Sequence, residues 1–329
     1  MFTFRSINSF NYNEVNQMEV KNEYGKSQVV VLNVGQDDVD GMLINWDLTD
    51  DGNYDYMEKW FVNSIMNYLP EYAMGYDAGN ISNANVIECV RETAKSVIQI
   101  KRINEIKQYL ESGTPYNEWD QEVLKIYNAK GIFSELILHF ILRDMKGTLP
   151  LISKIYFKDS ISVEAHGFDA VHVLDDKLYL GETKFYSDGK QGLKALINDL
   201  SKHFKHDYLK EQFVIISRAL IHNNEMREEW ISKLSSSKRL EDKLNMIYIP
   251  LLCVYEDKIA TDIINELNSN GRAESIYFDH VVGMKEFFDK NNTFPHQERV
   301  QPLLILLPVQ SKDRIVSAIL AKIYNMQNI

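Results

Sequence analysis

The chain has 329 residues, 45% of them hydrophobic, and its 36 lysines and arginines against 47 aspartates and glutamates give a formal net charge of −11 at pH 7. A chain of this length and apolar content can bury a sizeable core, in one large domain or two ordinary ones. The negative charge excludes a protein that coats nucleic acid through a broad basic surface, because affinity for phosphates comes from lysine and arginine.

Membrane spans, signal peptides and cysteine frameworks are not indicated by the sequence. The longest apolar runs, such as residues 303–309, are much shorter than the ~20 residues that a membrane helix needs. The first residues lack the basic start and apolar centre of a signal peptide. We therefore expect a cytoplasmic protein with no membrane contact. Cys89 and Cys253 lack disulfide or zinc-site spacing, so we expect two reduced thiols.

Residues 1–125 are predicted to form an α/β region appended to the rest of the chain, a regulatory or partner surface. Apolar runs and helical periodicity predict two strands and then two helices, at 28–34, 41–46, 57–69 and 83–111. Thr114-Pro115-Tyr116 ends the second helix. No internal repeat or low-complexity linker separates this region from the residues that follow.

An acidic stretch at 47–58 has the spacing of a calcium-binding loop. The residues at positions 1, 3, 5, 9 and 12 of an EF-hand loop, with glycine at the turn, would be Asp47, Thr49, Asp51, Asp55, Glu58 and Gly52. The residues before Asp47 are predicted as a strand, so the helix–loop–helix frame is missing. We favour an acidic loop before the helix 57–69, since carboxylates are favourable near a helix N-terminus. A Ca²⁺-responsive regulator remains the alternative.

Residues 131–145 predict a helix that is apolar almost all round and therefore buried. Glu135 lies within this helix, where an unpaired carboxylate would be costly. From the helix pattern alone, one interpretation of Glu135 is a glutamate on the helix surface. His139, one turn later, is expected to be a core or rim histidine.

Residues 167–185 predict a β-hairpin and carry three charged residues on one face. A strand is predicted at 151–157, and the runs Phe168–Leu174 and Leu178–Phe185 are separated by the turn-forming Asp175-Asp176-Lys177. Side chains alternate between the two faces of a strand. Asp169 on the first strand of the hairpin, and Glu182 and Lys184 on the second, are therefore expected to face the same way.

Charged side chains on the buried face of an apolar hairpin are costly unless they are paired or bind a metal. Two carboxylates supply the hard oxygen ligands that Mg²⁺ prefers, and a nearby lysine can orient or deprotonate a metal-bound water. This pattern is typical of phosphodiester cleavage. The alternative is an exposed hairpin on which Glu182 and Lys184 form a surface pair.

After the hairpin, a helix is predicted at 190–204 and a strand at 212–217. Lysines outnumber acids between 184 and 210, so this segment could grip DNA locally or form a solvated helix face. Beyond it, strands alternate with helices and are expected to extend the sheet by crossover units. The predicted helices are 223–243, 257–269, 280–291 and 311–326, and the predicted strands are 246–255 and 303–309.

The predicted order α-β-β-β-α-β over residues 130–217, with Asp on the second strand and Glu-x-Lys on the third, resembles the PD-(D/E)XK nuclease superfamily. Phe168 stands where the name-giving proline of that superfamily would be. The resemblance implies a restriction-endonuclease-like α/β fold with a mixed central sheet. Residues 126–329 would then hold the nuclease core and a C-terminal α/β extension, behind the N-terminal addition 1–125.

Three segments taken together, SELILHFILRD, GFDAVHV and LYLGETKFY, resemble the HamA family, the nuclease subunits of Hachiman anti-phage defence systems. That resemblance implies DNA as the substrate and a helicase, HamB, as the partner. An aspartate-rich block at 35–60 could repel phosphates or cover a basic groove. This block also favours a partner that restrains the nuclease or delivers DNA to it.

The expected cofactor is Mg²⁺, with Mn²⁺ as a possible substitute. Asp169 and Glu182 are expected to hold the metal together with the Thr183 carbonyl, because that backbone oxygen lies between the two site residues of the strand. Lys184 would position the attacking water, and the superfamily implies that Glu135 binds a second ion or its water shell. The competing hypothesis is a catalytically silent nuclease fold that binds DNA or regulates the helicase.

Overall fold

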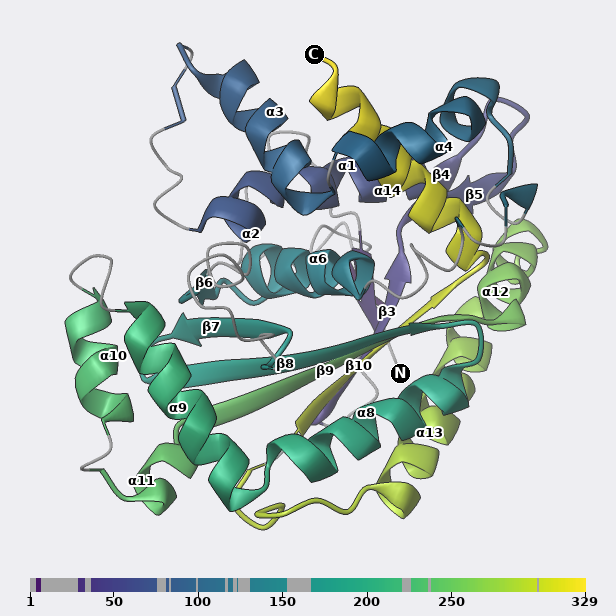
Figure 1. Cartoon of the computed structure of the whole chain (residues 1–329). Helices are drawn as coiled ribbons and strands as arrows, with labels where there is room; N and C mark the ends of the chain where they lie inside the picture. The colour runs from purple at the N-terminus through teal and green to yellow at the C-terminus, as the bar shows by residue number, and fades with distance from the viewer. Residues whose placement is uncertain are drawn as a thin grey trace.

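An eight-stranded sheet runs through the molecule, and helices cover both of its faces (Figure 1). This computed structural model describes residues 4–6, 29–32, 37–75, 81–82, 84–98, 100–115, 118–120, 123, 131–152, 167–220, 226–235, 238–300 and 302–329. The predicted α/β class with a mixed central sheet is confirmed. Within the described ranges, the structure has no helix of the length and apolarity required to cross a membrane.

The sheet has the strand order β1-β2-β3-β10-β9-β8-β7-β6. In that order the strands are Phe4–Ser6, Val29–Leu32, Val39–Ile44, Pro302–Val309, Ile247–Glu256, Lys177–Tyr186, Ala170–Leu174 and Leu149–Pro150. The four central strands, β3, β10, β9 and β8, are parallel, and the outer strands pair antiparallel on both sides. Parallel strands covered on both faces require nearly continuous apolar runs, which β9 and β10 have.

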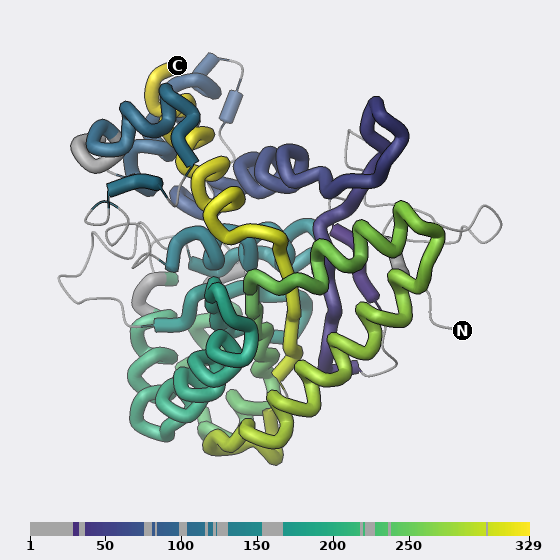
Figure 2. Tube along the Cα trace, turned by 90° about the vertical axis from the view of Figure 1, so that its right-hand side faces the viewer, coloured from purple at the N-terminus to yellow at the C-terminus, as the bar shows by residue number. Residues whose placement is uncertain are grey.

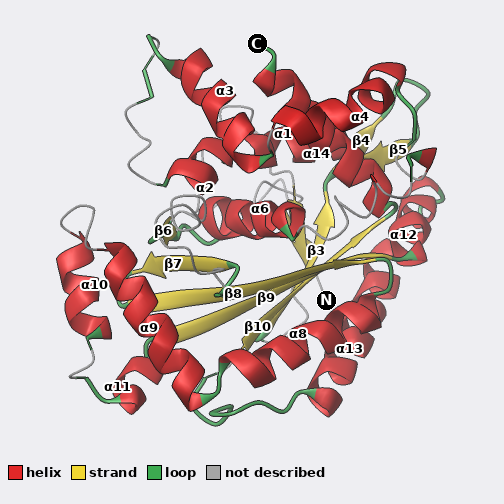
Figure 3. Ribbon diagram, in the orientation of Figure 1, coloured by secondary structure: helices red, strands yellow, loops and turns green. Residues whose placement is uncertain are grey.

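Two helical layers sandwich the sheet (Figure 3). The layer above the sheet in Figure 1 contains α1 (Glu58–Asn67), α2 (Leu69–Met74), α3 (Val86–Val97), α4 (Ile100–Ser112), α6 (Ile132–Phe140) with its π-helical continuation η3 (Ile141–Met145), and α14 (Lys312–Gln327). The helices between β8 and β10 in the chain are α8 (Gly189–His203), α9 (His206–Leu220), α10 (Met226–Leu234), α11 (Leu240–Leu244), α12 (Lys258–Asn268) and α13 (Ala273–Asn291).

The C-terminal helix α14 lies beside α3 and α4 in the first of these layers (Figure 2). The Gln327 side chain at the end of α14 donates to the Ala94 and Ile98 carbonyls, at 2.9 and 2.7 Å. Strands β2 and β3 of the N-terminal region also belong to the same sheet as the hairpin β7–β8. The division of the chain near residue 125 stays a prediction.

The strand predicted at 212–217 is wrong, because these residues lie inside helix α9. The buried apolar side chains of α9 recur at helical spacing, namely Leu209, Phe213, Ile216 and Leu220. Val214 in the same run is 40% exposed. The run Phe-Val-Ile-Ile is compatible with a strand by itself, and packing of one helical stripe decides the outcome. The helix predicted at 83–111 is divided into α3 and α4.

The first five elements of the predicted order, α-β-β-β-α, exist, but the strand predicted to follow them at 212–217 does not, and the next strand is β9. Helix α6, strands β6, β7 and β8, and helix α8 follow each other in the chain, and β9 then pairs parallel to β8. Helices α9, α10 and α11 lie between α8 and β9. The strand predicted at 151–157 starts earlier, as β6, and residues 153–157 lie outside the described residues.

The acidic stretch 47–58 forms a β-hairpin of strands β4 (Trp46–Leu48) and β5 (Tyr54–Tyr56), not a helix–loop–helix. Asp47 lies directly across from Asp55, and both are exposed. The hairpin packs on α12, where the Tyr56 hydroxyl donates to the Ala260 carbonyl at 2.8 Å. Acids on either side of it form ion pairs within the fold: Asp38 with Lys285, Asp40 with Lys146, and Glu58 with Arg314.

Candidate active site

The predicted hairpin forms and brings its charged residues together. Ala170 pairs with Gly181 across β7 and β8, so Asp169, just before β7, lies beside the residues that follow Gly181. The Asp169 N–H donates to the Gly181 carbonyl at 2.8 Å, and an Asp169 carboxylate oxygen accepts from the Thr183 N–H at 2.9 Å. These two bonds hold the Asp169 carboxylate against the Glu182–Lys184 segment.

Glu182 is the most deeply buried carboxylate of this group, with 2% of its surface exposed. Its Oε1 lies 2.5 Å from His203 Nδ1 at the end of α8. Burial raises the pKa of Glu182 to about 7; the His203 hydrogen bond opposes the rise, and the nearby Asp169 charge adds to it. The ionised form of Glu182 therefore needs a nearby cation or hydrogen-bond donor to stabilise its charge.

His203 is fixed by three neighbours. Its ring stacks on Tyr208 at 4.7 Å between centroids and meets the Phe168 ring edge to face at 5.6 Å. Burial alone would lower the pKa of His203, but the hydrogen bond and charge of Glu182 outweigh it and raise the pKa. The pKa values of both Glu182 and His203 are thus raised, and a hydrogen bond joins the two side chains.

Lys184 forms an ion pair of 2.5 Å with Asp199, which also lies on α8. Burial would lower the pKa of Lys184, but the hydrogen bond to Asp199 and its charge raise it, with smaller contributions from Asp169 and Glu182. The ammonium group therefore stays protonated. Of the two roles predicted for this lysine, the arrangement favours orientation and charge over removal of a proton.

Helix α8 is positioned so that Asp199 and His203 reach β8. Asp188 caps the helix by accepting from the Gln191 N–H at 2.8 Å. A Cβ atom at Gly192 would lie 2.7 Å from Cys253 Sγ, so glycine permits the close approach of α8 to β9. Asp199 and His203 are four residues apart, which places both on one side of the helix.

Glu135 reaches the site from α6. A Cβ atom at Gly181 would lie 2.6 Å from Leu138, so the absence of a side chain there lets α6 lie directly on β8. Thr183 Oγ1 donates to Ser134 Oγ at 2.7 Å, which bonds the helix to the site strand. Glu135 is 9% exposed and accepts from the Tyr72 hydroxyl at 2.5 Å.

The hydroxyl of Tyr72 is close to two carboxylates, Glu135 and Asp169. Burial raises the pKa of Tyr72 well above its usual value, and the charges of Glu135 and Asp169 both add to the rise. The hydroxyl therefore stays protonated and remains a donor. Tyr72 thus lies near both Glu135 of α6 and Asp169 of the hairpin.

His139 and His172 form a buried chain next to this cluster. His139 Nδ1 lies 3.1 Å from His172 Nε2, and His172 Nδ1 lies 2.9 Å from Thr148 Oγ1. The Thr148 hydroxyl gives its hydrogen to the Leu142 carbonyl, so His172 must donate to it through Nδ1 and accept from His139 through Nε2. Burial lowers the pKa of His139 to about 3, so both rings stay neutral, and the core position predicted for His139 agrees with its 3% exposure.

The donor set of the cluster suits Mg²⁺. In the described part of the chain, no group of three or more His, Cys, Asp or Glu side chains is arranged around one metal position. Mg²⁺ needs only one or two carboxylates, because it keeps several waters and takes substrate phosphates as ligands. Asp169 and Glu182 supply two carboxylates. A strand residue directs its N–H and C=O to the same side, so the Thr183 carbonyl points toward Asp169 as its N–H does.

Four neighbours of the predicted residues were not singled out from the sequence: Tyr72, Asp199, His203 and Tyr208. A signal existed for Asp199 and His203, which are four apart on the predicted helix directly after the Glu-x-Lys strand. No local pattern indicates Tyr72, which is 63 residues away from its partner Glu135. The predicted residues on the hairpin lie together, whereas their supporting contacts come from α2, α8 and α9.

Comparison with known proteins gives one match. A family model described as HamA matches residues 24–323 of the chain. No curated protein and no solved structure matches it. The matched stretch includes every residue of the candidate site.

Proposed function

The chain belongs to the HamA family of Hachiman anti-phage defence proteins, and from this premise we propose that it is a Mg²⁺-dependent deoxyribonuclease that acts with a helicase partner in a bacterial defence complex. The observation that carries the proposal is the juxtaposition of Asp169, Glu182 and Lys184 on one hairpin, each held by a second group. A surface pair of Glu182 and Lys184, the alternative from sequence, does not account for a glutamate that is 2% exposed.

Asp169 and Glu182 would hold the metal with the Thr183 carbonyl, and Glu135 would hold a second ion or its water shell. Bound Mg²⁺, or Mn²⁺ in its place, polarises a phosphoryl oxygen and lowers the pKa of its bound water. His203 fixes the Glu182 carboxylate in one orientation through its 2.5 Å contact. In metal sites, such supporting bonds orient the ligands and raise affinity.

Lys184 offsets the negative charge that develops on the phosphate in the transition state. Its raised pKa keeps the ammonium charged, and Asp199 holds it in place on the same face as Glu182. Asp199 and His203 are positioning residues in this scheme, since each acts through a residue of the hairpin. The buried hydroxyl of Tyr72 has the same relation to Glu135.

The partner helicase is part of the proposal because of charge as well as family. A protein with a net charge of −11 captures DNA poorly by itself, since phosphates must be neutralised by cations. A helicase that moves along DNA can deliver strands to the site. Size-exclusion chromatography with light scattering on the protein co-expressed with the neighbouring helicase should show co-elution.

The test is plasmid cleavage by the protein alone, by the helicase alone and by their mixture with ATP, each with Mg²⁺ or with EDTA. We expect cleavage that requires this subunit and is lost in EDTA. DNA binding without cleavage in every combination would support the silent, DNA-binding or regulatory subunit instead. Full activity of the lone subunit without co-elution would remove the helicase from the proposal but keep the nuclease.

A further inference from the structure

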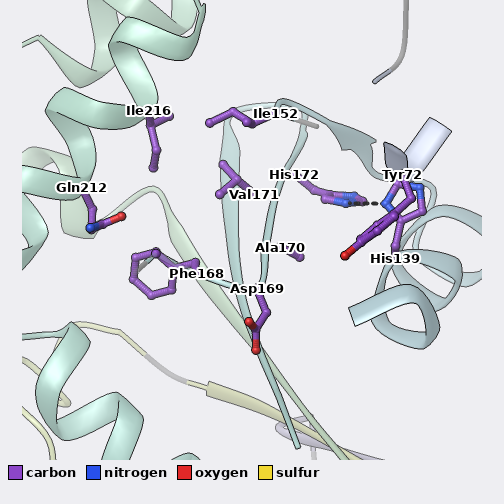
Figure 4. Close-up of a pocket in the computed structure, with 11 residues that line it drawn as sticks. Tyr72, His139, Ile152, Phe168, Asp169, Ala170, Val171, His172, Gln212 and Ile216 are labelled. Atoms are coloured by element: carbon purple, nitrogen blue, oxygen red, sulfur yellow. Dashed lines mark hydrogen bonds between the residues drawn. The ribbon is translucent and has the colours of Figure 1, made fainter. Parts of the chain in front are cut away.

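A pocket opens beside Asp169, between the start of β7 and helix α9 (Figure 4). Gln212 and Ile216 enter it from α9, and Phe168 and Val171 lie on the hairpin side. Asp169 is itself a lining residue, so the pocket is continuous with the proposed metal site. Any strand whose phosphate lies at Asp169 would place its neighbouring groups at this opening.

The chemistry of the pocket suits a neutral flat group better than a phosphate. Among the described residues that line it, Asp169 is the only charged one, and none is lysine or arginine. Phosphate binding needs cations or helix N-termini, which these lining residues do not supply. The ring of Phe168 and the aliphatic chains of Val171 and Ile216 offer apolar contact, and the Gln212 amide is a polar group in the lining. A nucleobase has this combination of apolar faces and polar edges.

The walls of the pocket are fixed by packing contacts, some of them with residues that also contact the candidate site. Phe168 packs against Phe204 at 5.8 Å and against His203, the neighbour of Glu182. A Cβ atom at Gly167 would lie 2.9 Å from the Gln212 amide oxygen, so glycine at this position lets the amide lie against the backbone. A preformed pocket loses little conformational freedom when a ligand binds.

Exposed lysines lie on α8 and α9, the two helices next to the site and the pocket. Apart from Lys184, the lysines of the segment 184–210 divide into two groups. Lys190 and Lys194 lie over the Phe287 ring of α13. Lys202, Lys205 and Lys210 are exposed around the turn between α8 and α9, next to His203 and Tyr208. Cations along the backbone and a pocket for bases are the two features that single-strand binding proteins combine.

We propose that this pocket receives an unpaired nucleobase, next to the phosphate held at Asp169 and Glu182, so that the site takes single-stranded DNA in preference to duplex. This inference rests on the proposed function and names its substrate class. A base in a duplex is stacked and paired and must be unpaired before it can enter such a pocket. Delivery of separated strands by a helicase would meet this requirement.

The experiment measures binding of fluorescent oligonucleotides to the full chain in Mg²⁺, with phosphorothioate linkages that resist cleavage. Three probes of equal length are compared: a single strand, the same strand with abasic residues throughout, and the duplex. We expect the single strand to bind roughly tenfold tighter than the abasic strand, since contacts to one base contribute about this much, and to bind tighter than the duplex.

Substitutions on α9 test whether the pocket causes the preference. Ile216 is 2% exposed in the pocket, and Ile216→Phe should fill it and abolish the difference between normal and abasic strands. Val214→Phe, on the 40% exposed side of the same helix, should leave the difference intact. Gln212→Ala provides a second pocket variant if Ile216→Phe fails to fold, and it should reduce the difference severalfold.

Equal binding of normal and abasic strands by the wild-type protein would overturn the inference, as would a preference that survives in a folded Ile216→Phe or Gln212→Ala variant. These results are separable from failure of the proposed function. Mg²⁺-dependent cleavage without a base preference would contradict base binding in the pocket and support the nuclease activity. A base preference without cleavage under any condition would support base binding and contradict the nuclease activity.

Discussion

The chain contains two acid-rich β-hairpins, and their surroundings differ. In β4–β5, Asp47 lies across from Asp55 and both carboxylates are exposed to water. In β7–β8, Asp169 and Glu182 also lie side by side, but Asp169 is half-buried and Glu182 is 2% exposed, with its carboxylate against His203 of α8. A carboxylate in water costs nothing, whereas a buried one needs a hydrogen bond, a cation or a metal. The comparison teaches that burial, and not the number of acids, distinguishes the candidate site.

The largest expected effect comes from removing charge at the buried hairpin. Asp169→Ala and Lys184→Ala should each reduce cleavage by at least about a hundredfold, because one loses a metal carboxylate and the other a transition-state cation. Folding should persist. The matched control is Lys190→Ala, whose ammonium lies over Phe287. Cleavage rates and far-ultraviolet circular dichroism measure the two effects, and normal cleavage in Lys184→Ala would remove that residue from the site.

Substitutions on α8 sharpen the comparison, because α8 contacts the charged groups of Glu182 and Lys184, whereas α12 contacts β4–β5 through Tyr56. Asp199→Asn and His203→Ala should reduce cleavage by ~10- to 100-fold, the usual effect of losing a group that orients a metal ligand. His203→Ala should also weaken Mg²⁺ binding, measured by calorimetry. Asp207→Asn, an exposed aspartate nearby, should change neither. If all three variants lost the same amount of stability, Asp199 and His203 would have only a structural role.

The local pattern of the sequence predicted the hairpin, but not what surrounds it. Alternation along β7 and β8 depends only on neighbouring residues, so Asp169, Glu182 and Lys184 could be assigned to one face. Gln212–Ser217 was misassigned because a short β-branched run fits either state until packing decides. The contacts of Tyr72 with Glu135 and of Asp199 with Lys184 depend on tertiary packing, which no local period encodes.

A smaller effect is expected from the buried histidines beside the site. Burial lowers the pKa of His139 to about 3 and lowers that of His172 too, so the unfolded chain takes up protons near pH 6.5 that the folded protein refuses. Stability should therefore fall as the pH drops below about 6.5, by about 2 kcal/mol per histidine at pH 5. Urea unfolding at pH 7 and pH 5 should show a smaller fall for His172→Gln than for the wild-type protein.

The exposed His206 provides the control for that measurement. His206→Gln should lose as much stability between pH 7 and pH 5 as the wild-type protein does. An equal fall for His172→Gln would mean that the histidine chain accepts protons in the folded state and is not held neutral.

At the exposed hairpin β4–β5 we expect no binding of Ca²⁺ and therefore no effect of substitutions on it. Because Asp47 and Asp55 face each other on strands outside a helix–loop–helix frame, calorimetry with Ca²⁺ should show no micromolar site in the wild-type protein. Asp47→Ala and Glu58→Ala should then change nothing. A clear isotherm that either substitution removes would contradict the contrast between the two hairpins and would favour a Ca²⁺-responsive regulator.

The central claim is that buried Glu182 holds a metal for DNA cleavage, and Glu182→Gln tests it most directly. Glutamine keeps the size of the side chain and an oxygen for His203, and the loss of a buried charge should leave stability unchanged or higher. The helicase complex containing Glu182→Gln should therefore assemble, bind DNA and fail to cleave it at any Mg²⁺ concentration that supports the wild-type complex. Cleavage at the wild-type rate by that variant would contradict the claim.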